Sequence, residues 1–79
     1  NSMSDKKQQL IDSFSYEDFE KFRKDYEHKM ERGEVEKVPL NVIIHKYIMH
    51  KEYIFQVDLD YKTYHELRQH IEFFLMEIK

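Results

Sequence analysis

The chain has 79 residues, with 16 Asp and Glu against 13 Lys and Arg and a formal net charge of −3. This length has room for one hydrophobic core, and 41% hydrophobic with 37% charged residues is typical of a folded domain, which excludes a disordered chain. The absence of cysteine excludes a disulfide framework and a thiolate metal site.

The N-terminal segment is polar. We expect residues 1–9 to form a flexible tail and residues 10–79 to form a single domain. We interpret Asn1-Ser2, ahead of Met3, as a remnant of recombinant expression. The polar N-terminus is unlike a secretory signal, and no apolar run approaches the ~20 residues that a spanning helix needs. We therefore expect a cytoplasmic protein with no membrane span.

The clearest helix signal begins at Phe14. Ser15 is a good N-cap, Asp18 places an acid in the first turn, and Phe14 and Phe19 form a hydrophobic staple. Gly33 is a typical residue just beyond a helix C-terminus, so the helix should end at the residue before it. Its apolar face recurs every three or four residues and consists of Tyr16, Phe19, Phe22, Tyr26 and Met30.

The middle of the chain contains two strand-like runs. Residues 53–60 alternate between apolar and polar side chains, which is typical of a strand with one wet face. Residues 40–48 are rich in Val, Ile and Tyr and provide a neighbouring strand that can satisfy the backbone. We expect an antiparallel hairpin that turns near residues 50–52.

An alternative is that residues 39–50 form a helix. Pro39 suits the first position of a helix, and the expected hairpin turn contains no Gly, Asn or Asp. Helical spacing also fits Leu40, Ile43, Ile44, Tyr47 and Ile48. That alternative gives a mostly α-helical bundle, but we favour the strand because β-branched residues dominate the segment.

The last element is a helix from Tyr64 to Ile78. Thr63 and Glu66 have the spacing of a capping box. The core-facing stripe consists of Leu67, Ile71, Phe74 and Ile78. Phe73 and Met76 project to other sides of this helix, which indicates a second buried face. The expected fold class is thus α+β, with the order helix, two-stranded antiparallel hairpin, helix, in which two amphipathic helices cover one face of a small sheet.

Surplus aromatic side chains indicate a binding surface. The chain has six Phe and six Tyr, and a domain of this size buries only about 60% of the surface that its unfolded chain exposes. We predict that Tyr47 and Met49 on the open sheet face, with Phe73 and Met76 on the last helix, contact a partner. A second copy that pairs with the sheet edge would give a homodimer.

Catalytic and metal-binding patterns are fragmentary. The five histidines do not supply three ligands at metal-binding spacing, and the only glycine ends a helix instead of forming a phosphate-binding loop. We therefore expect no metal, no cofactor and no catalytic residues. The favoured function is a non-enzymatic, self-associating module that binds an unidentified protein.

Two other functions stay open as alternatives. His45 and Asp58 on neighbouring strands could act as an acid–base pair in a small dimeric enzyme. Exposed aromatic side chains on the sheet could bind single-stranded nucleic acid by stacking. The acidic net charge argues against nucleic acid, because phosphate contacts by Lys and Arg dominate such binding.

Overall fold

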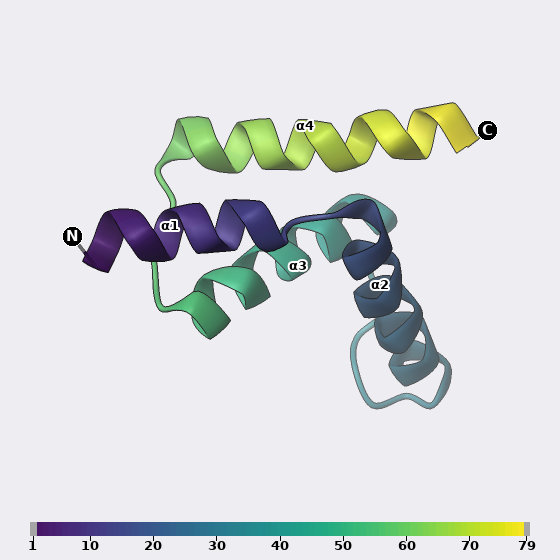
Figure 1. Cartoon of the computed structure of the whole chain (residues 1–79). Coiled ribbons are helices and arrows are strands. Elements are labelled where there is room, and N and C mark those ends of the chain that lie inside the picture. The colour runs from purple at the N-terminus through teal and green to yellow at the C-terminus, as the bar shows by residue number, and fades with distance from the viewer. Residues whose placement is uncertain (1, 79) are drawn as a thin grey trace.

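The computed structural model describes the backbone of residues 2–78 and the side chains of residues 5–76. In that part of the chain it contains helices α1 (Ser2–Ser13), α2 (Tyr16–Glu31), α3 (Leu40–Phe55) and α4 (Tyr61–Ile78). Helix α3 contacts each of the other three helices, and α2 also contacts α4. In Figure 1, α4 runs along the top, α2 descends on the right, and α3 passes beneath α1.

The expected α+β fold is wrong, because residues 2–78 contain no strand, and the alternative of a mostly helical bundle fits. Residues 40–55 form one continuous helix instead of a hairpin. A helix places Ile43, Ile44, Tyr47 and Ile48 together on one face, and all four are buried at 2% exposure or less. A strand would divide these side chains between its two faces. The helical period therefore buries more apolar surface.

The expected turn near residues 50–52 is also absent. Without Gly, Asn or Asp to reverse the chain, the helix continues until Gln56, which adopts the left-handed conformation with φ 54°. The alternation in residues 53–60 thus spans the end of α3 and the loop that precedes α4. The apolar residues of that alternation are not all buried: Val57 is 5% exposed, whereas Tyr53 is 82% exposed.

Helix α2 confirms the local signals at both of its ends. The Ser15 hydroxyl accepts the Asp18 backbone N–H at 3.1 Å, so Ser15 is the N-cap. The helix ends at Glu31, and Gly33 has φ 76° just beyond the cap. Phe19 is fully buried. The other members of the predicted apolar face pack against the core, namely Tyr16, Phe22, Tyr26 and Met30.

Helix α4 begins three residues earlier than predicted. It starts at Tyr61, so Thr63 lies inside the first turn, 9% exposed, and does not precede the helix as a cap. Asp60 stands directly before the helix, and its carbonyl accepts the Tyr64 backbone N–H at 3.0 Å. Hydrogen bonding from Thr63 and from Lys7 lowers the pKa of Asp60 to about 2. An acid before the first turn is favourable because the helix dipole is positive there.

Two clusters of buried side chains form the core. The larger one joins α2, α3 and α4 through Phe19, Ile43, Ile44, Tyr47, Ile48 and Ile71. The smaller one joins α1, the loop after α3 and α4 through Leu10, Val57 and Leu67. Residues 2–9, expected as a tail, are part of α1, and Lys7 forms an ion pair with Asp60 at 3.2 Å. None of the described helices has the length and apolar character needed to cross a membrane.

Candidate functional site

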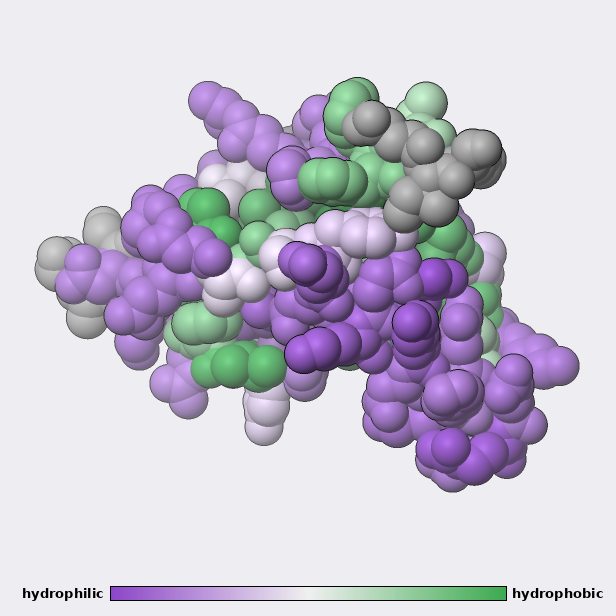
Figure 2. All heavy atoms as spheres, turned by 45° about the vertical axis from the view of Figure 1, so that its right-hand side comes forward, coloured by the Kyte–Doolittle hydropathy of each residue, from purple (hydrophilic) through white to green (hydrophobic). Residues whose placement is uncertain are grey.

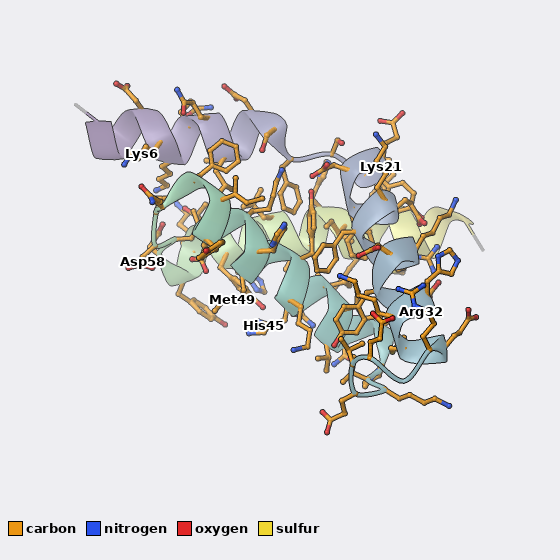
Figure 3. All side chains as sticks on the ribbon, turned by 90° about the horizontal axis from the view of Figure 1, so that it is seen from below. Lys6, Lys21, Arg32, His45, Met49 and Asp58 are labelled. Carbon is orange, nitrogen blue, oxygen red and sulfur yellow. The ribbon has the colours of Figure 1, made fainter. Side chains whose placement is uncertain are left out.

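An open groove of about 600 Å³ lies beside the C-terminal end of α3. Its lining consists of Met49, Glu52, Tyr53, Ile54, Gln56, Val57 and Asp58, and we call it the α3-end groove. Met49, Tyr53 and Ile54 are 49%, 82% and 54% exposed, so bulky apolar groups here stay in contact with water. Met49 lies near the middle of α3, and Figure 3 shows it between His45 and Asp58.

Backbone hydrogen bonds hold the groove in shape. The Gln56 N–H donates to the Tyr53 carbonyl at 3.3 Å, and the Val57 N–H donates to the Glu52 carbonyl at 3.1 Å. The Glu52 carboxylate then accepts the Leu59 N–H at 2.7 Å. These bonds keep the loop close to the last turn of α3, so the groove is a preformed part of the fold.

The charge of the α3-end groove is negative. Its charged lining residues, Glu52 and Asp58, are both acidic. The last turn of α3 carries no basic residue, so the helix itself does not neutralise the negative end of its dipole. Among the described side chains, neither acid takes part in an ion pair. The groove thus combines apolar surface with unpaired negative charge.

A second apolar surface lies on α4, on the side away from the core. Phe73 and Met76 are 61% and 71% exposed, whereas Leu67 and Ile71 on the core side are 9% and 0% exposed. We call the outward side the α4 outer surface; it comprises Tyr61, Lys62, His65, Glu66, Gln69, Phe73 and Met76, all of which are exposed. Figure 2 shows apolar side chains at the surface near the C-terminal end of α4.

The four predicted contact residues fall into different environments. Met49, Phe73 and Met76 are exposed, and their role in an interface stays a prediction. Tyr47 is 1% exposed in a single folded chain, because helical α3 turns it toward the core instead of toward an open sheet face. The groove at Met49 and the depression lined by Phe73 and Met76 share no lining residue, so the chain presents two surfaces.

A polar cluster joins α2 to α3 at the edge of the core. The Tyr47 hydroxyl donates to Asp18 Oδ2 at 2.6 Å, and Lys51 Nζ donates to the same oxygen at 2.9 Å. The Lys51 side chain is 8% exposed, and its ammonium lies 5.7 Å and 5.6 Å from the ring centroids of Tyr47 and Phe55. Because no buried polar atom of the cluster lacks a hydrogen-bond partner, we interpret it as structural.

The protonation states of this cluster agree with a structural role. Burial raises the pKa of Asp18, but the hydrogen bonds from Tyr47 and Lys51 outweigh it and hold the pKa below its ordinary value. Burial, followed by the nearby Asp18 carboxylate, raises the pKa of the Tyr47 hydroxyl far above neutrality. The carboxylate therefore stays charged and the phenol stays protonated, which leaves neither poised to transfer a proton at neutral pH.

The two alternative functions depended on a sheet that the described residues do not form. His45 lies on α3, where its Nδ1 is hydrogen-bonded to the Tyr64 hydroxyl, while Asp58 lies in the loop after α3, so the expected cross-strand pair does not exist. Stacking of nucleic acid on a sheet also has no basis, since residues 2–78 contain no sheet and Tyr47 is buried. Among the described residues, no group of three or more His, Asp and Glu side chains is placed to hold a metal ion.

No protein-family model, curated protein or solved structure matches this chain. The two surfaces therefore carry the functional argument. The sequence does not reveal the α3-end groove, because the alternation of residues 53–60 predicts a strand, whereas Tyr53 and Ile54 belong to α3. The buried position of Lys51 was also not predicted, because the expected hairpin places residue 51 in its turn, although helical spacing from Tyr47 and Ile48 places it on the core side.

Proposed function

We propose that this protein is a small helical interaction module that binds a partner protein and a second copy of itself and does not catalyse a reaction. One observation carries the proposal: five bulky apolar residues stay at least 49% exposed at two separate surfaces. These residues are Met49, Tyr53 and Ile54 at the α3-end groove and Phe73 and Met76 on the α4 outer surface.

The core does not need these side chains. Phe19, Tyr47, Ile48 and Ile71 are at most 1% exposed and fill the space between the helices. A large aromatic side chain offers roughly 150–250 Å² of surface. At 82% exposure, Tyr53 therefore leaves roughly 120–200 Å² in water, and Phe73 at 61% leaves roughly 90–150 Å². Clustered exposure of this size is typical of binding surfaces.

The α4 outer surface is the better candidate for self-association. Lys62 and Glu66 give it charges of both signs. A symmetric dimer brings the same patch of both copies together, so a patch of mixed charge avoids the repulsion that two copies of the acidic α3-end groove would face. Phe73 and Met76 would supply the apolar contact in each copy. We assign the groove to the partner protein and the α4 outer surface to the second copy.

Two variants test the proposal and control for each other. Phe73→Asp should reduce a light-scattering mass near twice that of one chain to the mass of one chain, because it places a charge in the dimer contact. Tyr53→Asp should leave the dimer intact but lose proteins that the wild type captures from its native lysate. Both residues are exposed, so far-ultraviolet circular dichroism should show unchanged helix content.

The contrary results are equally distinct. A wild-type chain that scatters as a monomer at micromolar concentration contradicts self-association. Identical sets of captured proteins for wild type and Tyr53→Asp contradict partner binding at the groove. Loss of helix content in Phe73→Asp would place that side chain in the core, against its observed exposure.

A further inference from the structure

We propose that the α3-end groove binds a basic amphipathic segment of a partner protein, in which a bulky apolar side chain lies next to Lys or Arg. This inference rests on the proposed function, because it takes the groove as the surface that contacts a partner. It adds the chemistry of that partner. The shape, the apolar lining and the charge of the groove all favour such a segment.

The shape and lining fit an apolar side chain. The groove offers about 600 Å³, which is room for more than one side chain. Met49, Tyr53 and Ile54 form exposed apolar walls. Val57, 5% exposed, also lines the groove and belongs to the smaller core cluster, so this part of the wall is fixed by packing. A partner would thus meet apolar walls on a backbone that is already folded, with Val57 held in place by the core.

The negative charge of the groove favours a partner that carries a cation next to that apolar side chain. Glu52 and Asp58 line the groove without an ion-pair partner among the described side chains, whereas neighbouring Asp60 is paired with Lys7 at 3.2 Å. The dipole of α3 adds partial negative charge at the same place, since its last turn lacks a basic residue. Lys or Arg of a partner would complement both sources of charge.

The same charge disfavours other occupants. A second copy of the groove would bring four carboxylates together, which is repulsive. Nucleic acid and an anionic membrane surface carry negative charge as well, and none of the lining residues is Lys, Arg or His. An acidic peptide meets the same repulsion. A cationic protein segment is the occupant that suits the apolar walls and the charge.

Titration with defined peptides tests this inference. The probe is a synthetic amphipathic helix of Leu and Lys, about 14 residues long, and the comparison peptide replaces every Lys with Glu. Chemical-shift mapping on the full chain labelled with nitrogen-15 should place the Leu–Lys peptide at residues 49–58. Fluorescence anisotropy should show binding of the Leu–Lys peptide that weakens with added salt and little binding of the Leu–Glu peptide.

Charge variants separate the groove from general attraction to an acidic protein. Asp58→Asn should weaken binding roughly two- to fivefold, as expected for one exposed charge pair. Glu36→Gln changes the net charge equally, but Glu36 lies in the loop between α2 and α3 and does not line the groove, so its affinity should be unchanged. Equal weakening by both variants, or shifts spread over the whole surface, would overturn the inference.

The proposed function has its own separate readout. If neither peptide binds residues 49–58 while Tyr53→Asp still loses a captured protein, the groove contacts a partner of other chemistry and only this inference fails. If the Leu–Lys peptide does not bind and capture is also insensitive to Tyr53→Asp, both proposals fail. Binding of the Leu–Lys peptide at the groove that Asp58→Asn weakens and Glu36→Gln does not supports the inference directly.

Discussion

Removing the negative charge of Asp18 should destabilise the fold far more than removing the positive charge of Lys51. Asp18→Asn keeps the side-chain shape and one oxygen that can accept the Tyr47 hydroxyl. It leaves the ammonium of Lys51 without a counter-charge at a site where that side chain is 8% exposed. A buried charge that loses its partner is strongly unfavourable.

The size of this destabilisation depends on how deeply Asp18 and Lys51 are each buried. Breaking a buried ion pair from one side costs about 3–5 kcal/mol. The Asp18 side chain is 44% exposed, so water screens part of the interaction and we expect a loss of about 2 kcal/mol. A chain of this length has a total free energy of unfolding of about 4–12 kcal/mol. The melting temperature should therefore fall by roughly 8–16 °C.

Lys51→Met should cost less than about 1 kcal/mol, because a methionine of similar length fills the space beside Tyr47 and Phe55 while the partly exposed Asp18 regains water. Urea unfolding followed by circular dichroism measures both variants. Glu17→Gln is the matched control, since it also removes a charge from the first turn of α2 and is exposed. Equal losses for Asp18→Asn and Lys51→Met would refute the argument, because the asymmetry comes from the unequal burial of the two partners.

Three further predictions concern the helix ends and acid stability. Ser15→Ala should lower the free energy of unfolding by about 1 kcal/mol, because it removes the acceptor for the Asp18 N–H, and an unchanged urea midpoint would contradict this. Gln56 and Gly33 both have positive φ, a conformation that glycine adopts without strain. Gln56→Gly should therefore stabilise the fold by about 0.5–1 kcal/mol, and Gly33→Ala should destabilise it by about 1 kcal/mol. Melting temperatures that shift in the same direction for both variants would contradict this explanation. The pKa of Asp18 is lower in the folded state than in the unfolded state. The ionised carboxylate therefore adds to the free energy of unfolding at pH values above the unfolded pKa, and this stabilisation is lost as the pH falls through the folded pKa. The difference in free energy of unfolding between wild type and Asp18→Asn should accordingly shrink below about pH 4 in urea titrations. A difference that grows as the pH falls would contradict this prediction.

Helix α2 was predictable because its signals are local. The cap at Ser15, the stop at Gly33 and an apolar residue every third or fourth position act within one helix and need no knowledge of the rest of the chain. On the predicted core face of α4, Leu67 and Ile71 are buried, Phe74 is 37% exposed, and the side chain of Ile78 lies outside the described residues. The exposure of Phe73 and Met76 agrees with their placement away from that face.

The start of α4 was wrong because two competing caps lie within the same segment. Thr63 and Glu66 have the right spacing for a capping box, but Asp60 also precedes a helical turn and forms an ion pair with Lys7. The pair depends on α1, which lies far away in sequence. A local pattern therefore could not decide between the two starts.

Residues 40–55 show most clearly what depended on tertiary packing. Their apolar and β-branched side chains are compatible with both a strand and a helix, and the difference lies in what each form can bury. As a helix, the segment lays Ile43, Ile44, Tyr47 and Ile48 against the other three helices. It also brings Lys51 to Asp18. Neither contact is visible in the segment alone.

The amino-acid sequence by itself determined where α2 begins and ends and that Leu67 and Ile71 of α4 face the core. Each of these depends on residues a few positions apart. Only the tertiary structure decided that α3 is a helix, that Tyr47 is buried, and that Met49, Tyr53 and Ile54 border an acidic groove. The physical reason is that burial depends on residues that are distant in sequence. A short apolar run fits both the helical and the strand periodicity, and packing against those distant residues decides which of the two forms.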